Sequence, residues 1–273
     1  MTISIKLIAI DIDATLLNSK HEITPAVREA IQKAKEAGKK VVICTGRPLS
    51  GAKQILKDLG LADQDDQYVV TFGGSLVQTT AGDSIFKATL TYADYVDLEY
   101  IARKKGLHFH ANGLDRLYTA NRDVGDYTMR EARLVSQAIS FRTPEEMHDI
   151  PVVKAMFVDE PEVIDEAIKD MSLFNQLADR VTYTRSTPYY FEANAKGINK
   201  ASALQQLAKV LDLTPAEIMA IGDQGNDLAM IEYAGTGVAM GNAIPEVKAV
   251  AQQITTDCDH DGVANAIYNW AMD

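Results

Sequence analysis

Two short apolar runs, each followed at once by aspartates, constrain the fold of this chain more than any other feature. Ile5–Ile10, apolar apart from Lys6, leads into Asp11 and Asp13, and Ile218–Ile221 leads through Gly222 into Asp223. Runs this short and this rich in isoleucine are typical of parallel strands buried on both faces. The carboxyl ends of such strands share one edge of a sheet, where α/β proteins bind ligands. The sequence therefore predicts three carboxylates at one sheet edge, where a hard cation such as Mg²⁺ would relieve their repulsion.

Strands and helices alternate at both ends of the chain. Thr24 and Pro25 suit the N-cap and first turn of a helix, and Gly38 suits its C-terminal end. The runs Lys40–Cys44 and Tyr68–Thr71 predict two further buried strands. We therefore expect an α/β fold whose core is a doubly wound, Rossmann-like parallel sheet.

The middle of the chain has a different pattern. Its predicted strands alternate between apolar and polar residues and are joined by tight turns, such as the one at Asn112-Gly113. This pattern is typical of an antiparallel sheet with helices on one face. We therefore expect an α+β cap domain, residues 88–192, inserted into a loop of a core domain formed by residues 1–87 and 193–273.

Charge and cysteine content narrow the classes of partner. The 273-residue chain has a formal net charge of −11, which argues against nucleic acid or an anionic membrane as partner. Cys44 and Cys258 are too few for a disulfide framework, which favours a reducing cytoplasm. We see no signal peptide, and no apolar run reaches membrane-spanning length. A small anionic substrate would then need local positive charge from a metal or from placed basic residues.

Asp11 and Asp13 have the spacing of two groups that act on one phosphoryl group. Positions i and i+2 of an extended segment lie on the same side, so both carboxylates can reach one bound group. Phosphoryl transfer needs an attacking oxygen, a role that suits Asp11, and an acid for the leaving oxygen, a role that suits Asp13. For either residue taken alone, an aspartate that merely caps a turn is about as frequent as an aspartate that reacts.

Two further segments could supply positive charge or anion binding. Thr45 and Gly46 form an anion-binding corner at the start of a predicted helix, although a plain N-cap threonine is more frequent. Lys196 or Lys200 could neutralise a phosphate as a point charge. Solvated lysines at the start of a helix are the commoner interpretation of either residue alone.

The segment 222–227 is the most specific of these signals. Asp223, Asn226 and Asp227 lie between a buried strand and a helix and form a compact set of hard oxygen donors. A glycine-rich turn with an aspartate cap is the less frequent alternative. The five histidines show no spacing that indicates a metal site.

Together these motifs resemble those of the haloacid dehalogenase superfamily. The chain has Asp-x-Asp at 11–13, Thr-Gly-Arg at 45–47, a lysine after a long insertion, and Gly-Asp-x-x-Asn-Asp at 222–227, in the order of that family. Segments 7–17, 42–47, 189–200 and 218–241 further resemble its Cof/YidA-type sugar-phosphate phosphatases. The likeness covers essentially the whole chain.

The resemblance implies a nucleophile, a general acid/base and a Mg²⁺ site. Asp11 would become an aspartyl phosphate, and Asp13 would act as general acid/base. Mg²⁺ would be held by the side chain of Asp11, the backbone carbonyl of Asp13 and the side chain of Asp223, with Asp227 supporting the metal through bound water. The residues implied to contact the phosphoryl group are Ile12, Thr45, Gly46, Lys200 and Asn226, with Lys196 as the alternative to Lys200.

Three positions depart from the family pattern. Ala14 replaces the glycine of Asp-x-Asp-Gly-Thr, Ala201 follows the motif lysine where glycine is common, and Gly73-Gly74 replaces an Asn-Gly pair. None of these changes removes a reacting group. Ala14 bears on the geometry of the nucleophile loop, because glycine at such a turn often signals a positive φ.

These features predict a Mg²⁺-dependent phosphatase of small phosphorylated metabolites, with sugar phosphates the favoured class. We expect the cap domain to shield the site and to select the leaving group through residues such as Tyr118 and Arg122. A phosphomutase on the same scaffold is one alternative, because phosphoenzyme formation is shared. A phosphometabolite-binding protein whose turnover is weakened by Ala14 is the other. The physiological substrate and the oligomeric state stay open.

Overall fold

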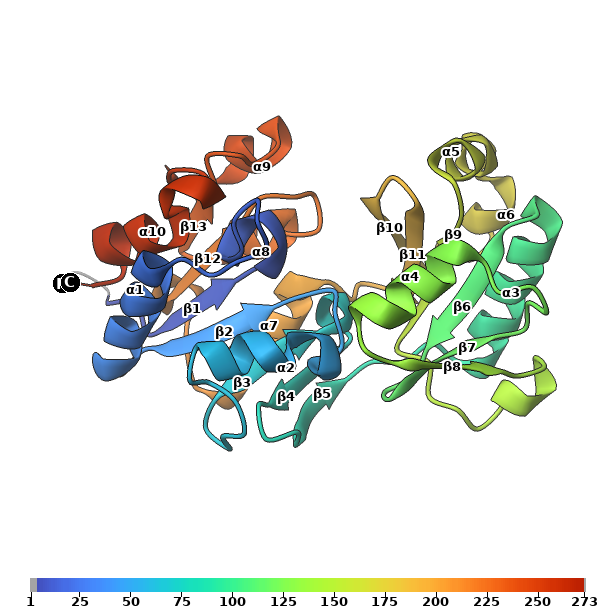
Figure 1. The fold of residues 1–273 in the computed structure, drawn as a ribbon, viewed down its shortest axis with the longest axis horizontal. Coiled ribbons are helices and arrows are strands. Elements are labelled where there is room, and N and C mark those ends of the chain that lie inside the picture. Colours follow the sequence, from blue (N-terminus) through green and yellow to red (C-terminus); the bar gives the residue numbers. More distant parts are fainter. Residues whose placement is uncertain (1–3, 273) are drawn as a thin grey trace. The chain divides into compact units, whose positions relative to one another are not determined.

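A computed structural model describes residues 4–272, which form two compact units (Figure 1). The core unit runs up to Phe86 and resumes at Asn199. The inserted unit is Lys87–Ile198. The predicted insert, residues 88–192, falls within the inserted unit. In the part of the chain that is described, no helix has the length and apolarity needed to cross a membrane.

The core unit is built on one eight-stranded sheet with the order β14-β13-β12-β1-β2-β3-β4-β5. From β14 to β3 the neighbouring strands pair in parallel, and β4 is antiparallel to β3. The strand order reverses at β1, which pairs with both β2 and β12. The strands are β1 (Leu7–Ile10), β2 (Lys40–Cys44), β3 (Tyr68–Thr71), β4 (Leu76–Thr79), β5 (Ser84–Lys87), β12 (Ile218–Gly222), β13 (Thr236–Ala239) and β14 (Gln253–Ile254).

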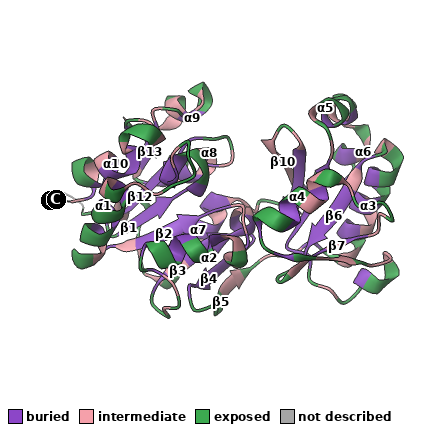
Figure 2. Cartoon of the chain, in the orientation of Figure 1, coloured by how far each residue is buried: buried purple, intermediate pink, exposed green. Residues whose placement is uncertain are grey.

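Helices cover both faces of this sheet, so its central strands are almost wholly buried (Figure 2). Thr24 caps the first helix, because its side-chain oxygen accepts a hydrogen bond from the backbone N–H of Val27. Helix α1 packs against α10, and α7 packs against α8. The helices are α1 (Pro25–Glu36), α2 (Leu49–Asp58), α7 (Lys200–Val210), α8 (Leu228–Tyr233), α9 (Pro245–Val250) and α10 (Gly262–Trp270). The predicted doubly wound α/β core is confirmed.

The inserted unit has a six-stranded sheet with the order β10-β11-β9-β6-β7-β8 (Figure 1). The strands are β6 (His108–Asn112), β7 (Arg116–Thr119), β8 (Ala138–Phe141), β9 (Lys154–Val158), β10 (Val181–Thr187) and β11 (Tyr190–Ala195). The helices are α3 (Tyr92–Lys105), α4 (Asp126–Leu134), α5 (Pro161–Lys169) and α6 (Ser172–Asn175). Thr91 and Asp94 form a capping box at the start of α3, and Gly106 ends this helix in the left-handed conformation.

An apolar core covers one face of the inserted sheet. Phe109, Phe157 and Phe191 of three neighbouring strands pack there with residues of α3, α5 and α6. Helix α4 contacts the other face, where its Tyr127 packs on Met156. Successive strand residues point to opposite faces, so the residues between the core phenylalanines belong to this second face.

Two details of the expected insert were wrong. Strand β8 was not predicted, and it pairs in parallel with β7. Helices also contact both faces rather than one, because α4 connects these two parallel strands and a crossover helix must pack over the sheet. The missed strand lies at the sheet edge and buries little of itself, which explains its weak apolar pattern.

Candidate active site

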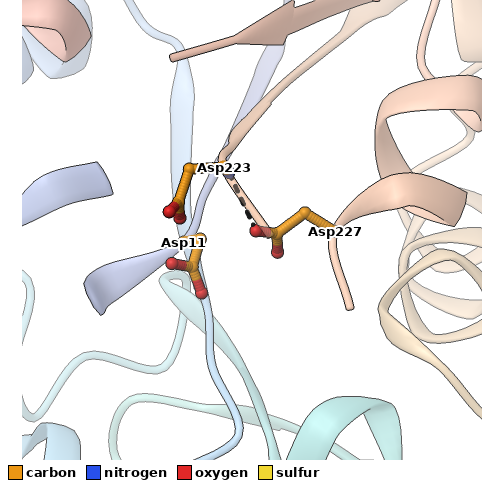
Figure 3. Close-up of side chains that lie close together, drawn as sticks. All are labelled: Asp11, Asp223 and Asp227. Carbon is orange, nitrogen blue, oxygen red and sulfur yellow. Dashed lines mark hydrogen bonds between the residues drawn. The ribbon is translucent and has the colours of Figure 1, made fainter. Parts of the chain in front are cut away.

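Three carboxylates converge at the point of the core sheet where the strand order reverses (Figure 3). Asp11 follows β1, Asp223 follows the neighbouring β12, and Asp227 begins α8 one turn later. Each offers an oxygen atom, and these atoms lie within 4.8 Å of one another. All three residues are buried. Of the three strand-end carboxylates that the sequence predicted, Asp11 and Asp223 are close together in space, whereas Asp13 is not part of this group.

Lys200 joins this group from the first turn of α7. Its Nζ lies 2.5 Å from Oδ1 of Asp11 and 2.6 Å from Oδ1 of Asp227. The side chain is 1% exposed, so the ammonium is held among carboxylates rather than in solvent. Lys196 belongs to the inserted unit, and its Nζ donates to the backbone carbonyl of Ala178. Of the two candidate lysines, Lys200 is therefore the one beside Asp11.

Burial dominates the electrostatics of the cluster. Burial, together with the charge of Asp227, raises the pKa of Asp11 well above its ordinary value, although Lys200 acts in the opposite direction. Burial and Asp227 raise the pKa of Asp223 to about 6. Burial alone would lower the pKa of Lys200, but the charges of Asp11 and Asp227 outweigh it and leave this pKa raised. Lys200 is therefore charged at neutral pH, and its single positive charge does not balance the negative charge of the three carboxylates.

The donor set fits a hard divalent cation. Three carboxylates against one ammonium leave two negative charges in a buried site. Carboxylate oxygens are the ligands that Mg²⁺ prefers. Asp227 is already engaged on both oxygens, because Oδ2 accepts the backbone N–H groups of Asp223 and Gln224 at 3.0 and 3.1 Å while Oδ1 contacts Lys200. This engagement suits a supporting role for Asp227 better than that of a direct ligand.

Asp13 is not one of the three clustered carboxylates, and its backbone is extended within the turn Ile12–Leu16. Its side chain is 57% exposed, and Oδ1 accepts a hydrogen bond from Arg47 at 2.5 Å. Ala14 follows with φ 56° and ψ 14°, which is the left-handed conformation. The side chain of Asn242 donates to the backbone carbonyl of Ala14 at 2.8 Å and holds this turn. An alanine therefore occupies the glycine-type conformation that the family pattern indicated.

The predicted phosphate-binding residues lie at neighbouring strand ends of the core unit. Thr45 is buried just after β2, and its Oγ1 accepts a hydrogen bond from the backbone N–H of Arg47 at 3.1 Å. A methyl group added to Gly46 would meet nothing within 4 Å, so space is open beside its backbone. Asn226 is half-buried in the turn before α8. The side chain of Ile12 is buried in the apolar core, so any contact it makes with a ligand would be through its backbone.

Two glycines allow the close approaches that assemble the site. A Cβ on Gly222 would lie 2.5 Å from the carboxyl carbon of Asp227, so only glycine lets this side chain fold back over the end of β12. A Cβ on Gly74 would lie 2.2 Å from the backbone oxygen of Asn199, the residue before Lys200. Gly73 has φ 67°, a conformation that asparagine and glycine both tolerate, which accounts for the Gly-Gly pair.

Three residues to which we assigned no role from the sequence contact residues of the site. Arg47 binds Asp13, Thr15 donates to Oδ1 of Asp223 at 3.0 Å, and Asn242 holds Ala14. Arg47 and Thr15 lie within the quoted motifs, so their positions could have drawn attention. Asn242 reaches the turn from a distant part of the chain, and we see no local signal that would have found it.

Comparison with known proteins identifies the family. The model of the haloacid dehalogenase-like hydrolase family matches residues 8–267. A provisionally named phosphatase of Streptococcus pyogenes serotype M6 is 44% identical over 270 residues, covering 98% of this chain and 99% of that protein. The 5-amino-6-(5-phospho-D-ribitylamino)uracil phosphatase YcsE of Bacillus subtilis is 33% identical, covering 99% and 97% of the two chains.

A solved structure agrees with this result. A haloacid dehalogenase-like hydrolase from Bacteroides thetaiotaomicron is 32% identical and aligns with a TM-score of 0.84, covering 97% of this chain and 99% of that one. The prediction of a phosphatase of this family is confirmed at the level of reaction class. The chain belongs to the haloacid dehalogenase-like hydrolase family.

Proposed function

We propose that this protein hydrolyses small phosphomonoesters, sugar phosphates in particular, through a Mg²⁺-dependent aspartyl-phosphate mechanism. The observation that carries the proposal is the buried contact of Lys200 with Asp11 inside the carboxylate cluster. A carboxylate with a raised pKa, paired with a fixed ammonium, is typical of a reacting group rather than of a surface turn.

Asp11 is the nucleophile in this proposal. Its carboxylate oxygen forms a bond to phosphorus while the bond from phosphorus to the leaving oxygen breaks. Asp13 gives its proton to that leaving oxygen. Asp13 then takes a proton from the water that attacks phosphorus, and the bond between Asp11 and phosphorus breaks to release inorganic phosphate.

The remaining residues hold the phosphoryl group and its charge. Lys200 neutralises negative charge beside Asp11. Thr45, the backbone N–H groups of Gly46 and Ile12, and the amide of Asn226 donate to phosphoryl oxygens. When bound, Mg²⁺ supplies Lewis-acid neutralisation of the phosphoryl charge. The residues that would hold it are Asp11, Asp13 through its carbonyl, and Asp223, with Asp227 behind them.

Arg47 holds the side chain of Asp13 in its charged form, the form that takes a proton from the attacking water. The exposed Asp13 carboxylate would sample several rotamers without a partner. The ion pair with Arg47 restricts it to one position. The guanidinium also lies at the end of the strand that carries Thr45, so it can turn toward an anionic substrate as that substrate arrives.

Names of relatives support a small phosphorylated substrate. One relative is a 5-amino-6-(5-phospho-D-ribitylamino)uracil phosphatase, and another, 30% identical, is an HMP-PP phosphatase of Yersinia pseudotuberculosis. We assign the choice of leaving group to the inserted unit, which is the part of the chain outside the phosphoryl-transfer machinery. We also assign the protein to a reducing cytoplasm, because Cys44 and Cys258 are both free thiols.

Phosphate release tests this proposal. Wild-type protein is assayed against a panel of sugar and other metabolite phosphates, with Mg²⁺ and with EDTA, and isomerised sugar phosphate is measured in the same samples. We expect Mg²⁺-dependent phosphate release in excess of any isomerised product. Product isomerisation without net phosphate release would instead indicate a phosphomutase, and tight Mg²⁺-dependent binding without either product would indicate a binding protein.

A further inference from the structure

One side chain of the core unit ties the turn that carries Asp13 to a distant part of the chain. The backbone of this turn changes direction sharply, because Asp13 is extended and Ala14 is left-handed with φ 56°. The carbonyl of Ala14 accepts a hydrogen bond of 2.8 Å from Nδ2 of Asn242. A left-handed backbone is unfavourable for alanine, so it persists where neighbouring groups hold it in place. Asn242 is such a group.

The side-chain amide of Asn242 is itself fixed in one orientation. Its Oδ1 accepts a hydrogen bond of 3.0 Å from the backbone N–H of Cys258, while its Nδ2 donates to Ala14. A flipped amide would set its N–H groups against the N–H of Cys258 and its oxygen against a carbonyl, so only one orientation satisfies both contacts. Asn242 is therefore a preset donor rather than a surface amide that is free to rotate.

The backbone on either side of Asn242 is anchored as well. The N–H of Gly241 donates to the carbonyl of Thr256 at 3.0 Å, which joins this segment to the loop 256–261. The N–H of Ile244 donates to the carbonyl of Asp223 at 3.0 Å, which joins it to the carboxylate cluster. The donor that holds the turn therefore has a fixed position relative to the clustered carboxylates.

Asp11 and Asp13 depend on the contact from Asn242 to different degrees. The backbone N–H of Asp11 donates to the carbonyl of Ile221 on the neighbouring strand at 3.1 Å, so the sheet places Asp11. Asp13 lies two residues further along, next to Ala14, and its side chain is 57% exposed. Its backbone position therefore depends on the turn. Loss of the contact from Asn242 should displace the carboxylate of Asp13 rather than that of Asp11.

We propose that Asn242 is a positioning residue for the general acid/base, which acts through the carbonyl of Ala14 and keeps Asp13 within reach of the leaving oxygen. A displacement of a reacting group by about 1 Å can slow a reaction about 10²-fold. The inference rests on the proposed function, because it takes Asp13 as the acid. It predicts a loss of rate that depends on the leaving group, as the loss of the acid itself would.

The test compares Asn242→Ala with the control Asn265→Ala. The amide of Asn265 also donates to the loop 256–261, but its hydrogen bonds go to Thr256 and His260 rather than to the turn. We measure kcat for phosphomonoesters that run from sugar and alkyl leaving groups to p-nitrophenyl phosphate. For Asn242→Ala we expect kcat to fall about tenfold or more with the poor leaving groups and less than about threefold with the aryl ester. Asn265→Ala should leave both within about twofold of wild type.

Two further variants show which contact matters and through which residue it acts. Asn242→Asp keeps the acceptor for Cys258 and removes the donor to Ala14, so it should lose rate in the same pattern, and a wild-type rate would overturn the inference. In the Asp13→Asn background the acid is already lost, so Asn242→Ala should lower kcat with poor leaving groups by less than about twofold more. A further loss as large as that in the wild-type background would show that Asn242 acts independently of Asp13 and would overturn the inference.

Thermal melting separates positioning from a structural role. Both hydrogen bonds of Asn242 are exposed, so Asn242→Ala should lower the melting temperature no more than Asn265→Ala does. A lower melting temperature with equal losses on all esters would mean that Asn242 is structural and would overturn the inference. Wild type that releases no phosphate, or Asp13→Asn with equal losses on all esters, would instead overturn the proposed function. These two results are distinguishable because neither involves a change at Asn242.

Discussion

The two polar regions of this protein differ in how their hydrogen bonds are satisfied. In the core unit, Asp227 accepts from Lys200 and from two backbone N–H groups, and Asp223 accepts from Thr15. In the inserted unit, both amide atoms of Asn112 have no partner among the described residues. The first region is organised by contacts among its own residues, whereas the second has buried polar atoms left unpaired among the described residues.

This difference suggests a division of work. A preorganised cluster treats every phosphoryl group alike, because its charges are already in place. The inserted unit, to which we assign the choice of leaving group, would distinguish the groups that carry the phosphate. Changes in the core unit should therefore affect all esters, and changes in the inserted unit should affect only some of them.

The largest expected effect is that of Asp11→Asn. An amide is a poor nucleophile, so turnover of sugar and aryl phosphates should fall alike, by more than about 10³-fold. Phosphate release and the melting temperature are measured beside Asp65→Asn, the same change at an exposed position of the core unit. Retained activity in a preparation free of deamidated or host enzyme would falsify the nucleophile assignment.

Asp13→Asn should have a large but unequal effect. Loss of the general acid should slow esters with poor leaving groups by about 10²- to 10⁴-fold and activated aryl esters much less, because a stable leaving oxygen needs no proton. The measurement is kcat across a series of leaving groups. Equal losses along the series would argue against the acid role and would make Asp13 part of the uniform core machinery. Arg47→Met, which removes the ion-pair partner of Asp13, should also lower kcat more for poor leaving groups than for aryl esters, but by a smaller factor.

The affinity for Mg²⁺ should fall as the pH falls, and this effect should be smaller than that of either aspartate substitution. The pKa of Asp223 is raised to about 6, so this group binds a proton below that pH and must lose it when the metal binds. Affinity for Mg²⁺ should therefore fall by up to about tenfold per pH unit below about 6. The stability of the metal-free protein should change with pH in the opposite direction to the affinity for Mg²⁺. A carboxyl group with a raised pKa destabilises the fold increasingly as pH rises from about 4 through 6.

Melting curves with Mg²⁺ and with EDTA between pH 5 and pH 8 measure both trends. We expect the stabilisation by Mg²⁺ to be greater at the higher pH. A metal-induced shift that is independent of pH would show that Asp223 is not a ligand.

The smallest expected effect is that of Ala14→Gly. Glycine removes the strain of φ 56° but also makes the unfolded chain more flexible, so the two contributions offset each other to within about 1 kcal/mol. Turnover should rise, because position 14 lies beside both reacting aspartates. Paired melting and phosphate-release measurements test this. An unchanged or lower rate would show that alanine suits this loop, since Asn242 holds its carbonyl in place, and the weakened binding protein would lose its main support.

Much of the core unit could be predicted from its sequence. Lys40–Cys44 and Tyr68–Thr71 are strands with the predicted bounds, and Thr24 and Gly38 delimit α1 as expected. Such signals act over a few residues, within one strand or one helical turn. The inserted unit was less predictable, because the edge strand β8 buries too little to show an apolar pattern.

The site was predictable as a set of residues but not as a set of contacts. The aspartates could be placed at strand ends because buried strands run into them. Lys196 and Lys200 could not be separated by spacing, and only the fold shows that Lys200 reaches Asp11. The ion pair of Arg47 with Asp13 was not predicted at all.

The sequence by itself determined which segments bury themselves as strands and which carboxylates follow them, because apolar periodicity and capping are local properties of the chain. Only the tertiary structure decided that β1 lies between β2 and β12, so that Asp11 and Asp223 meet, and that Lys200 of α7 reaches Asp11. The same holds in the inserted unit, where Asn112, Lys154 and Asn194 come from three separate strands. Contacts between distant segments depend on strand order and register, which are set by packing of the whole unit rather than by any short stretch of sequence.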